Sequence, residues 1–229
     1  GTDVADTLFL QDYSNEVWNG EIKFIGINGA NSSTGKIVIT NENVGEPLTI
    51  LSNNSPTADY IVHFENCKNF EFIGRGDVSD PYGIIIDCKN GVVGVNGILL
   101  KGFSDNYIID GIEITHSTGS PATTAGDHTG CGIKSDNYWY DENDDTEMSF
   151  WGPYRYNSQS YVAGYTIENV EIKNCKIHDI GGTGILLGDP NNQTTTVGDY
   201  TIYRHGFTDL KIHDNIIEDL GDDGIKVGD

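Results

Sequence analysis

The feature that most constrains the fold is an internal repeat with a spacing of 40 residues. "IKNCKIHDIGGTGILLGD" at residues 172–189 and "IHDNIIEDLGDDGIKVGD" at residues 212–229 are identical at eight of eighteen positions. The identical positions are Ile172/Ile212, Ile177/Ile217, Asp179/Asp219, Gly181/Gly221, Gly184/Gly224, Ile185/Ile225, Gly188/Gly228 and Asp189/Asp229. Agreement at a fixed offset indicates a repeat architecture, in which each unit buries its apolar face against the next.

A second, looser pair extends the repeat through most of the chain. "IVHFENCKNFEFIG" from residue 61 and "ILLKGFSDNYIIDG" from residue 98 share Ile61/Ile98, Asn69/Asn106 and Gly74/Gly111. Segments such as "VEIKNCKIHDI" alternate apolar and polar residues and are broken by Asn, Asp or Gly, the pattern of short strands joined by tight turns. The 29 Gly, 12 Tyr and 8 Phe, against one Met and 6 Pro, also favour strands over long helices. We predict an all-β solenoid.

The repeated phrases resemble a known architecture, the right-handed parallel β-helix of the pectate-lyase-like superfamily and of secreted bacterial β-helix repeat proteins. "FENCKNFEFIG", "SDNYIIDGIEI" and "IHDNIIEDLGDDGI" are similar to its coils. The turns where this architecture often has an asparagine ladder hold Asn66, Asn69, Asn106, Asn174 and Asn215. The resemblance covers residues 60–229, and residues 1–59 are expected to form the N-terminal cap and first coils. It implies an extracellular or cell-surface protein.

The phrase Gly-Ile predicts one strand that recurs in successive coils. It opens at Gly83-Ile84, Gly97-Ile98, Gly132-Ile133, Gly184-Ile185 and Gly224-Ile225, although the first is also compatible with an excursion between coils. We expect Ile98, Ile133, Ile185 and Ile225 to point the same way in adjacent parallel strands. Because the last copy would leave an open sheet edge, we also expect the chain to be a fragment of a longer β-helix, with the remainder of the polypeptide as its partner.

The charge of the chain limits its partners. Thirteen Lys and Arg against 35 Asp and Glu give a net charge of -22, which would repel nucleic acid and anionic membranes. No apolar run approaches the roughly 20 residues of a membrane-spanning helix, and the start "GTDVADTLFL" has no signal-peptide pattern. The four cysteines lie far apart without a C-x-x-C pair, and we expect buried core side chains rather than reactive thiols.

Two long insertions follow the common strand directly, at residues 137–164 and 190–208, so both should emerge on the same side. The first is rich in aromatic residues, whose faces can stack on sugar rings. The candidate substrate-binding residues are Trp139, Tyr140, Trp151, Tyr154 and Arg155. The alternative is that these side chains form a satellite core that holds the long loop down.

Calcium is the candidate cofactor, because divalent cations prefer oxygen ligands. Asp87, Asp136, Asp189 and Asp229 end the common strand, and the last three are expected on one side of the stack. "DENDDTEMSFWG" fails as an EF-hand, since its sixth residue is Thr146 and its twelfth is Gly152. The candidate metal ligands are Asp136, Asp141, Asp144, Asp145 and Asp189. The alternative for each is a turn residue that bonds its own backbone.

Two resemblances suggest catalysis, and neither is complete. "GDDGIKVG" resembles the double-aspartate segment of polygalacturonases, in which one Asp acts as general acid and others activate water, and the resemblance implies that Asp222 and Asp223 carry those roles. That family's other segments are not found in this sequence, and the alternative is a turn of the repeat. Polysaccharide lyases of this fold use a basic residue to abstract a proton. The candidate catalytic residues are Lys134, Asp136, Asp189, Arg204, His205, Asp222 and Asp223, with Lys226 also on the common strand.

The sequence therefore predicts a secreted or cell-surface β-helix protein that binds polysaccharide, or a cell-surface glycan, along the side of the insertions. Cleavage by a lyase or hydrolase mechanism stays open. The alternative is a non-catalytic adhesin or structural surface protein.

Overall fold

The computed structural model describes residues 6–10, 22–29, 35–51, 60–89, 94–101, 104–118, 130–136, 161–162, 167–188, 195–197, 200–202 and 207–227. Within these residues the regular secondary structure consists of β-strands alone, so the fold class is all-β, as predicted. No helix in this part of the chain is long and apolar enough to cross a membrane.

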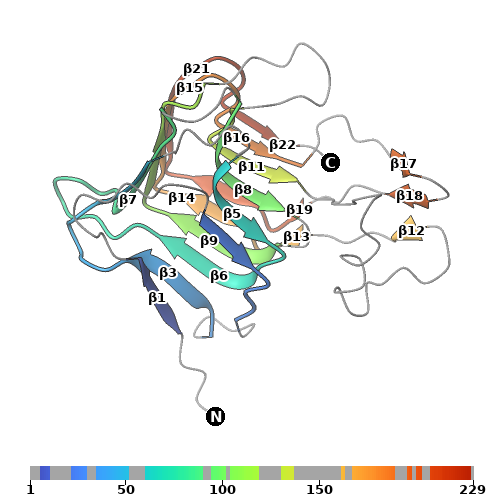
Figure 1. Ribbon diagram of the computed structural model, residues 1–229, viewed down its shortest axis with the longest axis horizontal. Helices are drawn as coiled ribbons and strands as arrows, with labels where there is room; N and C mark the ends of the chain where they lie inside the picture. Colours follow the sequence, from blue (N-terminus) through green and yellow to red (C-terminus); the bar gives the residue numbers. More distant parts are fainter. Residues whose placement is uncertain are drawn as a thin grey trace.

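Three sheets of parallel strands, named A, B and C, are stacked around a common core (Figure 1). Sheet A contains, in order, β1 (Thr7–Leu10), β3 (Ile37–Asn41), β6 (Lys68–Ile73), β9 (Asp105–Asp110), β14 (Glu171–Lys173) and β20 (Lys211–His213). Sheet B contains β2 (Ile22–Ile25), β5 (Tyr60–Glu65), β8 (Asn96–Lys101), β11 (Ile133–Asp136), β16 (Ile185–Leu187) and β22 (Ile225–Val227). Sheet C contains β4 (Leu48–Leu51), β7 (Ile84–Asp87), β10 (Ile112–Thr115), β15 (Lys176–Ile180) and β21 (Ile216–Leu220).

The chain visits the sheets in the fixed order A, C, B. We call one such passage a circuit; the first complete one is β3-β4-β5, followed by β6-β7-β8, β9-β10-β11, β14-β15-β16 and β20-β21-β22. Each strand pairs in parallel with the strand of the same sheet in the next circuit. This arrangement is compatible with a β-solenoid.

The predicted register of the two 40-residue repeats is confirmed. Ile172 pairs with Ile212, and Ile177 pairs with Ile217. In sheet B, Ile133 pairs with Ile98 on one side and with Ile185 on the other, and Ile185 pairs with Ile225. These four sheet B isoleucines therefore point the same way, as expected.

The register of the earlier pair is correct in one half and wrong in the other. Lys68 pairs with Asp105 and Phe70 with Tyr107, which brings Asn69 level with Asn106 as predicted. Ile98, however, pairs with Val62 rather than Ile61. The cause is a turn of unequal length, because two residues separate β5 from β6 whereas three separate β8 from β9.

Gly83-Ile84 does not belong to the common strand. Ile84 pairs with Leu48 and Ile112 in sheet C, so Asp87 also lies in sheet C, opposite Thr115. The alternative of an excursion between coils is also wrong, because β7 is a regular strand of sheet C within the β6-β7-β8 circuit. In sheet B, Ser135 pairs with Leu187, so Asp136 is level with Gly188; Asp189 lies outside the described residues.

The inward-facing rows of the three sheets form the core. Sheet C contributes Ile50, Ile86, Ile114 and Ile177, all fully buried, and each such side chain stabilises the fold by about 1.5–3 kcal/mol. Four aromatic rings stack from circuit to circuit, in the order Phe24, Phe64, Phe70 and Tyr107, with ring centroids 4.9, 4.6 and 5.5 Å apart. All four cysteines are buried and form no disulfide, as expected of core side chains.

A column of glycines explains why the phrase Gly-Ile repeats. A Cβ atom on Gly184 would lie 2.7 Å from the carbonyl oxygen of Gly224 and 2.8 Å from Cγ2 of Ile217. The same conflict would arise at Gly97 and Gly132, each against the backbone of the next circuit. The glycine is thus imposed by the close approach of successive circuits at the corner between sheets C and B.

The two long insertions meet each other. The first contains β12 (Tyr161–Val162), and the second contains β17 (Thr195–Val197) and β18 (Tyr200–Ile202). β18 pairs in parallel with β12 and antiparallel with β17, which gives a small sheet D that stands apart from sheets A to C (Figure 1). Nearby in the chain, β13 (Ile167–Glu168) pairs with β19 (Phe207–Thr208).

Candidate functional site

The candidate site is the outer face of sheet B, where β11 and β16 end just before the two insertions begin. These strands are adjacent and parallel, so the chain leaves both at the same edge of the sheet. The prediction that the insertions emerge on the same side is therefore supported by the pairing of the strands that precede them.

Lys134, a candidate from the sequence, lies in the centre of a row that crosses sheet B. We follow the paired residues outward from Lys134, strand by strand, and call the resulting set the sheet B row. The row consists of Lys23, His63, Leu99, Lys134, Leu186 and Lys226. Because side chains alternate between the faces of a strand, all six point away from the core.

The sheet B row contains basic and apolar residues and no acid. The outer rows of the other two sheets mix both signs: Glu113 neighbours Lys176 in sheet C, and Asp110 neighbours Lys173 in sheet A. The next outward row of sheet B has Lys101 between its ladder partners Glu65 and Asp136, so the excess of basic residues is confined to the sheet B row. Such a row favours an anionic ligand by Coulomb attraction.

Burial along the row is uneven. Leu99 and Leu186 are buried at 6% and 2% exposure although they face outward, and His63 is buried at 3%. Lys23 is exposed and Lys134 is partly exposed. Cationic groups are therefore accessible at separated points, with apolar side chains packed between them.

The first circuits hold one end of the row through an aromatic contact. The ring of Tyr60 lies 4.3 Å from the ring of His63, and Nζ of Lys23 sits 5.3 Å from the Tyr60 centroid. His63 Nε2 also lies 3.8 Å from a carboxylate oxygen of Glu65. The Lys23 ammonium thus gains a cation–π contact while its charge stays near the surface.

Asp222 and Asp223 lie in the turn that connects β21 to β22. The Thr183 hydroxyl donates to Asp222 Oδ2 over 3.3 Å, and the backbone N–H of Gly184 donates to the carbonyl of Asp223 over 3.0 Å. Lys226 Nζ lies 3.4 Å from Asp223 Oδ2. These contacts join the turn to the preceding circuit, as expected for a turn of the repeat.

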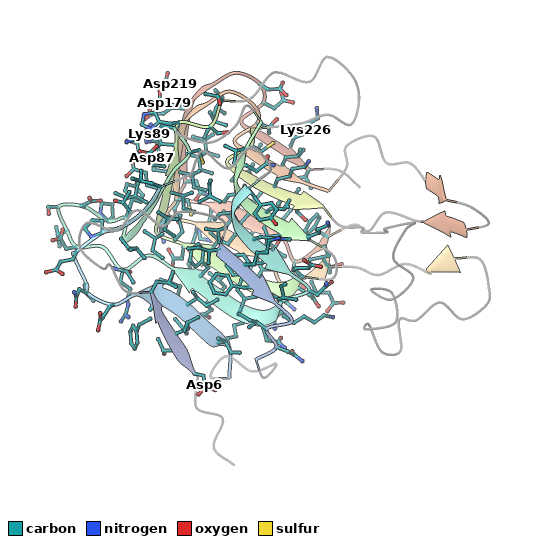
Figure 2. All side chains as sticks on the ribbon, in the orientation of Figure 1. Asp6, Asp87, Lys89, Asp179, Asp219 and Lys226 are labelled. Carbon is teal, nitrogen blue, oxygen red and sulfur yellow. The ribbon has the colours of Figure 1, made fainter. Side chains whose placement is uncertain are left out.

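Lys226 is remote from the aspartates of sheet C and its turns (Figure 2). In Figure 2 Lys226 lies apart from Asp87, Lys89, Asp179 and Asp219, which gather along another side of the molecule. The carboxylate of Asp87 lies 2.9 Å from Nζ of Lys89 and 3.0 Å from Nδ1 of His116. Ion pairs are thus present in both places, since His63 and Lys226 of the sheet B row also lie near Glu65 and Asp223.

Most other candidate residues lie outside the described part of the chain. The backbone of Asp136 pairs with Lys101 at the end of β11, but its side chain is not described. The candidates outside the described residues are Trp139, Tyr140, Asp141, Asp144, Asp145, Trp151, Tyr154, Arg155, Asp189, Arg204 and His205. Their roles in sugar binding, catalysis and calcium binding stay predictions.

Among the described residues, no group of three or more His, Cys, Asp or Glu side chains is arranged to hold a metal ion. The side chain of Asp136 is not described, and the other four candidate calcium ligands lie outside the described residues. Calcium therefore enters no step of the function proposed below.

Sequence reasoning found Lys134 and Lys226 but missed Lys23 and His63. The signal was present in six tripeptides, "IKF", "VHF", "ILL", "IKS", "ILL" and "IKV", which begin at Ile22, Val62, Ile98, Ile133, Ile185 and Ile225. The middle residue of each occupies the sheet B row. The tripeptide at Val62 was missed because Ile61 rather than Val62 was matched with Ile98. The tripeptide at Ile22 lies within residues 1–59, for which only a cap and first coils were expected.

Comparison of the chain with protein-family models, with curated proteins and with solved structures finds no match. The fold and the site are therefore described from this chain alone.

Proposed function

We propose that the protein is an extracellular or cell-surface right-handed parallel β-helix that binds an anionic polysaccharide along the outer face of sheet B. The observation that carries this proposal is the acid-free sheet B row in a strongly acidic chain. A polymer with carboxylate or sulfate groups can lie across the strands and contact cations on successive circuits. The pectate-lyase-like resemblance of the sequence supports the same fold.

The spacing of the lysines suits a polymer rather than a small ligand. Lys134 and Lys226 lie two strands apart, and neighbouring strands are about 4.8 Å apart, so their Cα atoms are separated by roughly 10 Å. Lys23 lies three strands from Lys134 in the other direction. Contacts spread over this length require an extended ligand.

The insertions are placed to add a second binding surface. Both leave sheet B at the same edge, and they pair with each other in sheet D. We propose that Trp139 and Trp151 of the first insertion stack on sugar rings of the bound polymer. Cleavage of the polymer is a separate question. Among the described candidates, Lys134 lies in β11, whereas Asp222 and Asp223 lie in the turn between β21 and β22.

Binding is tested with K134Q/K226Q, which removes two cations from the sheet B row. The matched control is K176Q/K211Q, which removes the same charge from the outer rows of sheets C and A. Affinity electrophoresis in gels with polygalacturonate, alginate or neutral dextran measures retention. We expect the anionic polymers to retain K134Q/K226Q severalfold more weakly than the wild type and to retain K176Q/K211Q as strongly as the wild type. Neutral dextran should retain none of the three proteins.

Equal loss in both variants would show that net charge alone decides retention, and the proposed site would be wrong. Catalysis is measured separately on the same polymers, as unsaturated ends for a lyase or new reducing ends for a hydrolase. Retention without either product supports the alternative of a non-catalytic surface protein.

A further inference from the structure

Three histidines each contact a carboxylate of the preceding circuit. His116 Nδ1 lies 3.0 Å from Asp87 Oδ1, and His178 Nε2 lies 2.8 Å from Glu113 Oε1. His213 Nε2 lies 2.9 Å from Glu171 Oε1. The β6-β7-β8 circuit is thus joined to β9-β10-β11, that circuit to β14-β15-β16, and that one to β20-β21-β22.

Two of these histidines belong to the repeated phrase "IHD" at residues 177–179 and 212–214. In both copies the second ring nitrogen faces the aspartate that follows: His178 Nδ1 lies 2.8 Å from Asp179, and His213 Nδ1 lies 2.8 Å from Asp214. A neutral imidazole has one N–H and can donate to only one carboxylate, whereas an imidazolium donates to both. The geometry of each copy is therefore fully satisfied only by the charged ring.

The surroundings of these rings are dominated by acids. His178 pairs with Glu218 on β21 and with Thr115 on β10. Lys176 is the nearest lysine of the same strand. Lys173 is the ladder partner of His213 on β14 and itself lies 3.9 Å from Asp110. Asp87, which faces His116, also lies 2.9 Å from Lys89. Carboxylates therefore outnumber lysines around these histidines.

We propose that His178 and His213 are proton-dependent ties between successive circuits, which hold the C-terminal circuits more tightly at mildly acidic than at mildly alkaline pH. The N-terminal circuits have no equivalent tie among their described residues, so the effect is local. The described contacts thus make the C-terminal end of the stack responsive to the pH of its surroundings.

The sign and the pH window follow from the His213 pair. Hydrogen bonds to Asp214 and then Glu171 raise the pKa of His213 above its usual 6.5, so its contribution is fully present below pH 6.5 and is lost as the pH rises through the raised value. The hydrogen bond from His213 lowers the pKa of Glu171 below its usual 4.5, so that carboxylate contributes above pH 4.5 and is lost as the pH falls through the lowered value. The tie is therefore complete between about pH 4.5 and 6.5.

Local stability is measured by hydrogen exchange with mass spectrometry on the 229-residue chain at pH 5.5 and 8, corrected for the intrinsic exchange rates. We expect residues 207–227 to be severalfold better protected at pH 5.5, and residues 36–51 to serve as an internal control with a smaller change. In H178Q/H213Q, where glutamine keeps a donor but cannot be protonated, the difference at residues 207–227 should fall to that of the control segment.

A second variant keeps the test valid if the histidine variant does not fold. E113Q/E171Q removes the carboxylates of the preceding circuits and should reduce the same pH difference, while the contacts to Asp179 and Asp214 stay. The proposal is wrong if wild-type residues 207–227 show no excess protection at pH 5.5, or if the excess is undiminished in either variant.

Discussion

The side-chain amide of Asn106 donates from Nδ2 to Oδ1 of Asn69, one circuit earlier, over 2.6 Å. Asn69 in turn donates to Oδ1 of Asn28 over 3.1 Å and to the carbonyl of Gly29 over 2.8 Å. Asn69 and Asn106 both adopt left-handed backbone angles, with φ of 54° and 50°. Asparagine suits this corner because it tolerates that conformation and supplies both a donor and an acceptor along the stack.

The asparagine ladder predicts graded losses of stability at position 69. N69G keeps the left-handed backbone but removes the ladder bonds, and should lower the free energy of unfolding by about 1–2 kcal/mol. N69A also places a Cβ in the left-handed region, and should cost about 1 kcal/mol more. Urea denaturation measures both values. Equal losses for the two variants would mean that backbone conformation plays no part.

The glycine column predicts a contrast between Gly184 and Gly224. A Cβ on Gly184 would meet backbone at 2.7 Å, whereas a Cβ on Gly224 would meet nothing within 4 Å. G184A should therefore lower the free energy of unfolding by about 1–3 kcal/mol, the usual cost of overpacking, and G224A in the same chain should be nearly neutral. Thermal unfolding followed by circular dichroism compares them. A large loss in G224A would contradict the steric explanation.

Sequence periodicity was sufficient for the fold class and for much of the register. Ile172/Ile212 and Ile185/Ile225 could be paired because the two units have the same length and no insertion falls within them. The pairing of residue 98 failed because strand periodicity does not report the length of a turn, and one extra residue between β8 and β9 shifted the match. Gly83-Ile84 was ambiguous because sheets B and C use the same apolar pattern.

The site was less predictable than the fold. Lys134 and Lys226 looked like ordinary solvated strand residues, and only the parallel pairing of six strands places them in one row with Lys23 and His63. The bridges from His178 and His213 to the preceding circuit were also missed. Each depends on which residue of the previous circuit lies alongside, and that is a property of the stack rather than of any local motif.

Asp87 gives a prediction for acid stability. Its side chain is 10% exposed, and although burial opposes its ionisation, hydrogen bonds from Lys89 and His116 hold its pKa below the usual 3.8. A lowered pKa means that the stabilisation is present above pH 3.8 and is lost as the pH falls through the lowered value. D87N should therefore be less stable than the wild type at pH 7, and the two should converge below that value.

We expect the melting temperature of D87N at pH 7 to be about 2–4 °C lower, equivalent to about 1 kcal/mol for a chain of this size. K89Q removes one of the two partners and should lose part of the same amount. Differential scanning calorimetry at pH 7 and pH 3 compares the three proteins. A gap between D87N and the wild type that does not depend on pH would indicate a packing effect instead of a lost charge.

Tyr107 gives the last prediction, because its hydroxyl is fully buried without a hydrogen-bond partner among the described residues. Burial also raises the pKa of this phenol, so the group stays neutral. The ladder partner of Tyr107 in the preceding circuit is Phe70, which fills the same place in the aromatic stack without a hydroxyl. Y107F should keep the stacking and raise the free energy of unfolding by about 1–2 kcal/mol, because folding no longer buries a hydroxyl without a hydrogen bond. The reciprocal variant F70Y should lower it by a similar amount, and urea denaturation of both measures the cost of one hydroxyl at two adjacent levels of the stack. A loss of stability in Y107F would show that the hydroxyl has a partner in the folded protein.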